Sequence, residues 1–132
     1  MKMRASFVSN SSSTSFIAVT DNINTSVPVR GTNNTLEDFG WKLTTMKELI
    51  EWIDQNWIEF KDDENIEDQI KEHYNENSVA TYRMMKKEIE SGRAIITGSF
   101  ADDTGSDVET DLRNGEFDNY INEAELLQYY SE

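Results

Sequence analysis

RAIITGSF, residues 93–100, is the stretch of this sequence that decides the fold. Its two isoleucines, its threonine and its closing phenylalanine favour an extended backbone. Gly92 precedes it as a helix stop, and a polar loop begins at residue 101, so both ends of the segment are marked. We therefore predict a β-strand over residues 93–100.

The segment before this strand has the period of an amphipathic helix. Ser78 is a residue type that caps helix N-termini, and the Ser91-Gly92 pair is a helix stop. We predict a helix over residues 78–91. Its expected buried face consists of Val79, Tyr82, Met85 and Ile89.

A second helix is predicted over residues 45–57. Thr45 and Glu48 have the T-x-x-E spacing of a capping box, in which each side chain binds the backbone N–H of the other. Apolar residues then follow at spacings of three and four, which places them on one stripe. The members of this stripe are Met46, Leu49, Ile50, Ile53 and Trp57.

A thinner apolar stripe predicts a third helix, over residues 63–75. It holds only Ile66, Ile70 and Tyr74, and the acidic residues 62–64 suit its N-terminus because of the helix macrodipole. A helix with so little apolar surface is expected to lie outermost.

The two ends of the chain supply the remaining β candidates. Residues 14–20 predict a strand, with Phe7-Val8 as the start of a partner for it and the serines between them as the connection. Residues 26–30 are a second candidate, at a sheet edge because Pro28 has no N–H to donate, followed by a turn over residues 31–34.

The C-terminal part of the chain is harder to assign. Residues 108–113 are compatible with a short helix closed by Asn114-Gly115. Residues 116–130 are compatible with either a helix or a terminal strand, and helix is favoured.

Together these elements predict a single α+β domain over residues 1–132. A small antiparallel sheet, built from the N-terminal strands and residues 93–100, packs against two or three amphipathic helices. Residues 1–15 form either a polar hairpin or a flexible leader.

Composition and charge exclude several kinds of protein. The 132 residues include 12 basic and 26 acidic side chains, a net charge of −14, so direct nucleic-acid binding through phosphates is not expected. Residues 101–132 alone hold one basic and ten acidic side chains. No cysteine is present and no apolar run is long enough for a signal peptide or a membrane span, so we expect a cytoplasmic protein.

The densest carboxylate group follows the 93–100 strand, and a metal site has to be weighed there. The calcium-loop pattern is not met, because Asp103 is followed by Thr104-Gly105 and the required Glu is missing, so a solvated acidic loop is favoured and no metal or cofactor is expected. His73 is the single histidine, on a charged helix, and no nucleophile elbow, phosphate loop or zinc motif occurs. We do not expect an enzyme.

Four aromatic residues, Trp41, Trp52, Trp57 and Phe60, surround the 45–57 helix, and core positions are expected for most of them. Trp52 directly precedes Ile53, so on a helix its side chain lies about 100° around the axis from that of Ile53. It is therefore the residue expected to be partly exposed and to anchor a partner, because interface hot spots are enriched in Trp.

The segment RASFVSNSSSTSF, residues 4–16, resembles the R-x-x-FVSNSSSSSF opening of many small, mostly uncharacterised proteins of bacteriophages and prophage-bearing bacteria. It departs from that opening at Thr14 and covers about a tenth of the chain. The resemblance implies a phage-like origin more than an activity, and it assigns no functional residue.

Three functions remain open at this point. The first is an acidic protein that inhibits a host defence or nucleic-acid-binding protein by occupying its basic surface, as DNA mimics do; phages encode such inhibitors, anti-CRISPR proteins among them. The second is a structural or accessory phage protein, and the third is a small enzyme or metal-binding module. The oligomeric state is not indicated. The expected partner-binding residues are Asp102, Asp103, Asp107, Glu109, Asp111 and Trp52.

Overall fold

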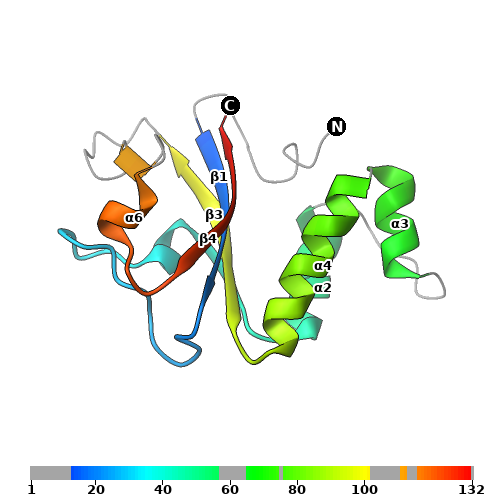
Figure 1. Cartoon of the computed structure of the whole chain (residues 1–132), viewed down its shortest axis with the longest axis horizontal. Helices are drawn as coiled ribbons and strands as arrows, with labels where there is room; N and C mark the ends of the chain where they lie inside the picture. The colour runs from blue at the N-terminus through cyan, green and yellow to red at the C-terminus, as the bar shows by residue number, and fades with distance from the viewer. Residues whose placement is uncertain (1–12, 57–64, 75, 102–110, 113–115, 132) are drawn as a thin grey trace.

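The predicted central strand lies inside a four-stranded antiparallel sheet (Figure 1). In the computed structural model, which describes residues 13–56, 65–74, 76–101, 111–112 and 116–131, the strand order is β2-β3-β1-β4. The strands are β1 (Ser13–Thr20), β2 (Gly40–Leu43), β3 (Ala94–Ala101) and β4 (Glu125–Ser131). The predicted α+β class and antiparallel sheet are confirmed.

β1 and β3 are the two interior strands, and they pair along their whole length. Ser13 lies opposite Ala101 and Thr20 opposite Ala94, without a break in register. Both strands carry apolar residues on consecutive positions, because each face of the sheet is covered.

Three helices lie on one side of the sheet: α2 (Met46–Asn56), α3 (Ile66–His73) and α4 (Glu76–Glu90). α2 and α4 contact the strands directly. They enclose a core with one face of the sheet, and α3 packs on α4 on the side away from the strands (Figure 1). The outermost position predicted for the third helix is confirmed. This core contains Ile17, Val19, Leu43, Leu49, Trp52, Ile53, Ile70, Val79, Tyr82, Met85, Ile89 and Ile95.

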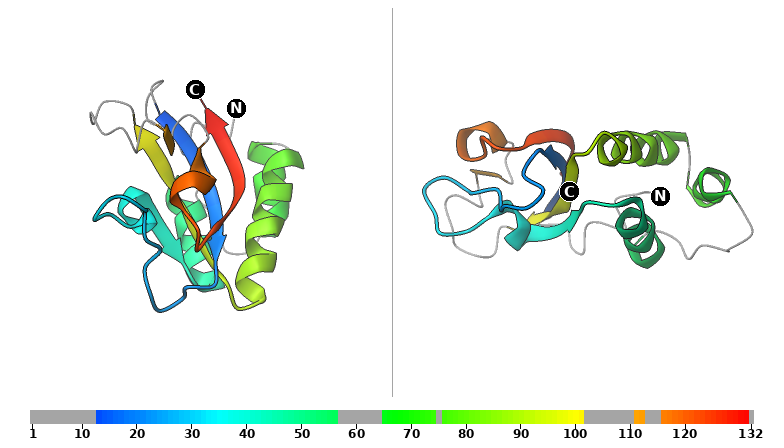
Figure 2. Two further views of the ribbon diagram at one scale, coloured as in Figure 1. Left: turned by 60° about the vertical axis from the view of Figure 1, so that its left-hand side comes forward. Right: turned by 90° about the horizontal axis from the view of Figure 1, so that it is seen from below.

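The opposite face is covered by short elements and loops rather than long helices (Figure 2). They include the loop over residues 21–35, the 3₁₀ helix η1 (Leu36–Phe39) and the short helix α6 (Phe117–Tyr120). The second core contains Phe16, Ala18, Val27, Val29, Leu36, Ile96, Phe100, Leu112, Phe117 and Ile121.

The local helix signals are largely confirmed. Thr45 and Glu48 form the predicted capping box, with Glu48 N–H donating to Thr45 Oγ1 at 3.1 Å and Thr45 N–H donating to Glu48 Oε1 at 3.2 Å. α4 ends at Glu90, and Gly92 has the positive φ of 93° that favours glycine after a helix. α4 begins at Glu76, however, so Ser78 is a buried helical residue and the prediction that it caps the helix is wrong.

Two predictions about the strands are wrong. Residues 26–30 form no strand; Pro28 makes a single isolated bridge to Thr35, while Val27 and Val29 are buried in the second core. Residues 125–131 are strand rather than helix, because they pair with β1 on the side away from β3. Only Phe117–Tyr120 within the ambiguous segment is helical. β2 was not anticipated.

Several other predictions lie outside the described residues. These are the partner strand at Phe7-Val8, the acidic residues 62–64, and the aromatic residues Trp57 and Phe60. Of the helix predicted over 108–113, the structure describes only Asp111 and Leu112, both helical.

β2 and β3 approach closely where two glycines face each other. Gly40 pairs with Gly98, and a Cβ atom on Gly98 would overlap the backbone carbonyl of Phe39. Phe16, which lies opposite Gly98 on the neighbouring strand, stacks on Phe100 with ring centroids 4.6 Å apart. The glycine pair therefore sets the distance between the edge strand β2 and the interior of the sheet.

Replacing Gly98 by Ala is expected to destabilise the protein by at least about 2 kcal/mol, since backbone rather than a flexible side chain occupies the space. The control is Gly31→Ala, where φ is 79° but nothing lies within 4 Å, at a cost of about 1–2 kcal/mol from strain alone. Urea unfolding measures both. Equal stability of Gly98→Ala and the wild type would contradict the close approach.

The capping box makes a pH-dependent contribution to stability. Hydrogen bonds from the Thr44 backbone and hydroxyl lower the pKa of Glu48 below its ordinary value of 4.5. A lowered carboxyl pKa stabilises the fold above the unfolded-state pKa, and this contribution is lost as the pH falls through the folded-state pKa. The Glu48→Gln variant should be less stable than the wild type by about 0.5 kcal/mol at neutral pH, and this difference should shrink as the pH falls from neutral through the folded-state pKa of Glu48. A difference that stays constant across this range in urea unfolding would contradict the assignment.

Candidate acidic binding surface

Most of the carboxylate group predicted as a binding site lies outside the described residues. This applies to Asp102, Asp103, Asp107 and Glu109. Asp111 is described and is half-buried, where its carboxylate accepts a short hydrogen bond from the Tyr120 hydroxyl. Its backbone carbonyl also accepts from the Glu116 N–H at 3.0 Å. Asp111 therefore helps to hold α6 in place, and its membership of a binding surface stays a prediction.

The prediction that Trp52 is a partly exposed anchor is wrong. Its side chain is 5 % exposed and belongs to the core between the sheet and the helices. α2 packs against both β2 and α4, so it buries a wider surface than one apolar stripe. Trp52, next to Ile53 on the helix, therefore lies within this buried surface.

Of the two tryptophans that the structure describes, Trp41 is the exposed one, with 56 % of its surface accessible. It lies on the edge strand β2, opposite Thr97. Leu43, two residues further on the same face, is only 4 % exposed because it belongs to the core beneath the helices, and this cover does not extend to Trp41. The core position expected for Trp41 is therefore wrong.

A shallow pocket opens where β4 begins. It has a volume of about 280 Å³ and is lined by Asp21, Asn22, Arg93, Asn122, Glu123, Ala124 and Glu125. These residues come from the end of β1, the start of β3 and the turn before β4, which the antiparallel pairing brings to the same end of the sheet. The sequence separates them by about a hundred positions, so no local pattern predicts the pocket.

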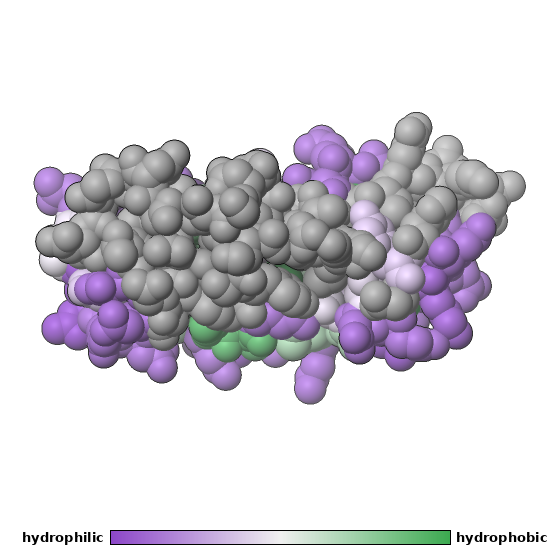
Figure 3. Space-filling model, turned by 90° about the horizontal axis from the view of Figure 1, so that it is seen from above, coloured by the Kyte–Doolittle hydropathy of each residue, from purple (hydrophilic) through white to green (hydrophobic). Residues whose placement is uncertain are grey.

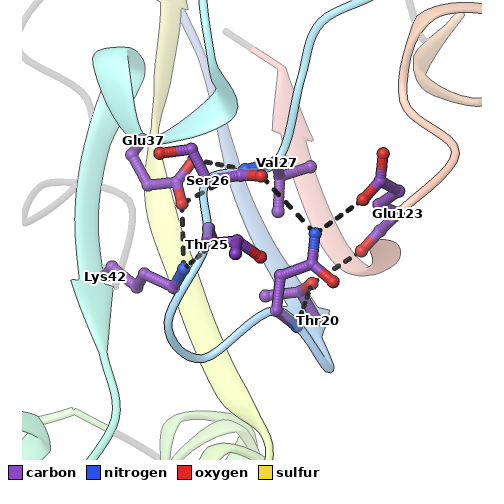
Figure 4. A network of polar contacts seen from close by, with 8 residues as sticks. Thr20, Thr25, Ser26, Val27, Glu37, Lys42 and Glu123 are labelled. Atoms are coloured by element: carbon purple, nitrogen blue, oxygen red, sulfur yellow. Dashed lines mark hydrogen bonds and ion pairs between the residues drawn. The ribbon is translucent and has the colours of Figure 1, made fainter.

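Glu123 is held in a fixed position at this pocket. Its Oε1 accepts a 2.7 Å hydrogen bond from the Asn22 amide, and its backbone carbonyl accepts a 2.6 Å hydrogen bond from the Thr20 hydroxyl (Figure 4). The Asn22 side chain also contacts the Ser26 carbonyl at 3.5 Å. These bonds connect the turn before β4 to the loop that leaves β1.

The positive charge of Arg93 is already engaged. Its Nε donates to Asp21 Oδ1 at 2.8 Å and its Nη1 to Glu88 Oε1 at 3.2 Å. Partial burial alone would lower the pKa of Arg93, but the hydrogen bonds and negative charges of Asp21 and Glu88 together outweigh this effect and raise the pKa. The pocket lining therefore holds three carboxylates, Asp21, Glu123 and Glu125, and one guanidinium, that of Arg93. Because Arg93 is paired with Asp21 and with Glu88, the charge of the pocket is negative.

A second ion pair in the same region is structural. Lys42 Nζ lies 3.0 Å from Glu37 Oε2 and donates to the Thr25 carbonyl at 2.7 Å, while Glu37 accepts from the Val27 N–H (Figure 4). Both side chains are more than four-fifths buried. The pair fastens the 21–35 loop to β2, which keeps Val27 in the second core.

Charge is unevenly compensated over the described residues. Lys42, Lys71, Arg83 and Arg93 each form an ion pair with a carboxylate. The hydrogen bond from Arg83 lowers the pKa of Glu67, which ties α4 to α3. Residues 111–112 and 116–125 instead contain five acidic side chains and no basic one: Asp111, Glu116, Asp118, Glu123 and Glu125.

The exposed members of this last group define what we call the acidic surface: Glu116, Asp118, Glu123 and Glu125. Glu116 is the N-cap residue of α6 and Asp118 lies on α6, whereas Glu123 and Glu125 lie on the turn that follows and at the start of β4. Trp41 lies on β2, at the opposite edge of the sheet from β4, so no exposed tryptophan among the described residues accompanies the acidic surface.

No protein-family model, curated protein or solved structure matches this chain. Among the described residues, no group of three or more His, Asp or Glu side chains is placed to hold a metal ion. The helices described here are also too short and too polar to cross a membrane. The side chain of His73 lies outside the described part of the chain, so its predicted exposure stays a prediction.

Substitution of the two tryptophans tests their assignments. Trp52→Ala is expected to destabilise the protein by about 3–5 kcal/mol, because it leaves a large cavity in the helical core. Trp41→Ala should change the free energy of unfolding by no more than about 0.5 kcal/mol, as for an exposed side chain. Denaturant unfolding of both variants provides the comparison, and equal losses would contradict it.

Proposed function

We propose that this chain is a non-enzymatic binding protein that occupies the positively charged surface of a nucleic-acid-binding host protein. The single observation that carries the proposal is the acidic surface over residues 116–125. Its four carboxylates are exposed, and residues 116–125 contain no basic side chain. Arg93, which lines the pocket beside this surface, is already paired with Asp21 and Glu88.

The net charge of −14 gives the acidic surface a long-range effect. A strongly negative protein attracts basic surfaces and repels nucleic acid, and such steering raises association rates at low ionic strength. A partner whose basic groove receives these carboxylates has lost the site at which phosphates bind. The consequence is inhibition by competition, without any chemical step.

The fixed position of Glu123 supports a binding role over a purely solubilising one. A flexible surface carboxylate loses side-chain entropy when it enters an ion pair. The Asn22 amide and the Thr20 hydroxyl fix both ends of Glu123 before any partner arrives. Less entropy then remains to be lost on binding.

The resemblance of residues 4–16 to the opening of phage and prophage proteins adds to this proposal. Phages encode small proteins that block host defence, anti-CRISPR proteins among them, and an inhibitor of this kind acts in the cytoplasm of the host cell. The partner then belongs to the nucleic-acid-binding machinery of that host.

The test is competition for DNA. Purified DNA-binding proteins of the host, with defence nucleases included, are mixed with labelled duplex DNA, and fluorescence anisotropy follows the release of DNA as this chain is added. At least one protein should lose its DNA, and its affinity for this chain should fall steeply between about 50 and about 300 mM salt. Competition that is insensitive to salt, or its absence throughout the panel, would contradict the proposal.

Charge removal locates the binding surface. A triple variant, Glu116→Gln, Asp118→Asn and Glu123→Gln, should weaken binding by about tenfold. Each lost charge is expected to cost between a few tenths of a kcal/mol and about 1 kcal/mol of binding free energy. The matched control removes the same number of charges from α3 and the start of α4, through Asp68→Asn, Glu72→Gln and Glu76→Gln, where all three residues are exposed. Equal losses in the two triple variants would show that net charge alone acts, and that the acidic surface is not the site.

A further inference from the structure

We infer that the outer edge of β4 accepts an extended, basic segment of the partner as an added strand. The inference rests on the proposed function, because it takes the partner to be positively charged, and it names how that partner is held. The surface involved is the backbone edge of β4 together with the negative pocket at its start.

Among the described residues, β4 is the longer of the two edge strands of the sheet. It has seven residues and pairs with β1 on one side only, whereas β2 at the other edge has four. No strand of the described chain lies beyond β4, which forms the edge nearest the viewer in Figure 1. About half of the backbone N–H and C=O groups of an edge strand point away from its neighbour, where another strand can use them.

The composition of β4 lacks the usual protection of an edge. Glu125 is its single charged residue, and it contains no lysine and no proline. Leu126 and Leu127 are only partly buried, and Figure 3 shows a hydrophobic patch at the lower border of the view, on the side of the molecule to which β4 belongs. Apolar side chains of an added strand have a surface to contact there.

One irregularity limits the regular part of the edge. The register shifts between Ile17 and Ala18, so that Leu127 is an extra residue on β4. From Gln128 to Ser131 the pairing with β1 is unbroken. The ladder therefore offers four consecutive regular positions, and the bulge at Leu127 lies between them and the pocket at the start of β4.

The pocket at the start of β4 favours a basic residue in the segment that binds. Glu123 and Glu125 line it together with Asp21, and its one cation, Arg93, is bound to Asp21 and Glu88. A guanidinium from outside finds carboxylate oxygens in this pocket, with one of them positioned by Asn22. An extended segment of eight residues spans about 26 Å, enough to cover β4 and reach the pocket.

Charge decides between a basic partner and a second copy of this chain. Pairing of two β4 edges would bring together two molecules of net charge −14 each, with acidic residues at the start of both strands. Opposite charges attract and like charges repel at the separations of a strand pair. A basic segment is therefore the occupant that the edge and the pocket fit.

The experiment uses a labelled eight-residue probe peptide of alternating valine and threonine with two arginines at one end, made in both orientations. Fluorescence anisotropy against the full chain gives its affinity. Two further versions carry N-methyl groups on alternate amides, one on the odd and one on the even positions. In an added strand only one of these sets faces β4, so one version should lose at least about tenfold in affinity while the other binds as before.

Two variants of the chain complete the test. Glu123→Gln should weaken binding of the unmodified peptide by about threefold to tenfold, and the matched control Asp68→Asn on α3 should leave it unchanged. Equal binding of both N-methylated versions would overturn strand addition while leaving an electrostatic inhibitor in place. Strand addition would also be overturned if no peptide binds, or if sedimentation shows a concentration-dependent dimer of this chain that does not bind the peptide. A negative result in the DNA competition experiment would instead contradict the proposed function.

Discussion

The pairing of β1 with β3 is the interaction on which the rest of the structure depends. Both strands carry apolar side chains on both faces, so their ladder is stable only if both faces are removed from water. The helices supply one cover, and the 21–35 loop, η1 and α6 supply the other. This one constraint produces two separate cores, one on each face of the sheet.

Charge is arranged around these cores in two different ways. On the helical side and at the β1–β3 end of the sheet, two arginines are paired with carboxylates: Arg83 with Glu67, and Arg93 with Asp21 and Glu88. Residues 116–125 instead contain four exposed carboxylates and no basic residue of their own. Excess negative charge therefore lies beside the β4 edge of the sheet, next to the pocket that Arg93 lines.

Local signals in the sequence predicted what local interactions determine. The capping box at Thr45 and Glu48, the buried face of α4 and the strand after Gly92 all depend on neighbours within a few positions. The exposure of the tryptophans depends on which elements pack nearby, and there the prediction was wrong. Trp52 is buried because α2 has two neighbours, and Trp41 is exposed because β2 is an edge.

The pocket and β4 could not be predicted from short stretches of sequence, because both depend on contacts between residues that are far apart in the chain. Residues 125–131 have the composition of a helix or a strand, and pairing with β1, more than a hundred positions away, decides between them. Glu123 and Asn22 meet only once that pairing exists. Of the predicted site residues, Asp111 proved to be a support for α6, whereas Asp102, Asp103, Asp107 and Glu109 lie outside the described residues.

The place of β1 in the sheet has a consequence for how the protein is made. β1 is synthesised first, but its two neighbours, β3 and β4, begin at residues 94 and 125. The apolar sequence from Phe16 to Val19 must therefore remain unpaired while most of the chain leaves the ribosome. Such delayed, non-local pairing slows folding and leaves apolar segments open to aggregation or chaperone binding. The helices, whose contacts are closer in sequence, can form while β1 still lacks both of its partner strands.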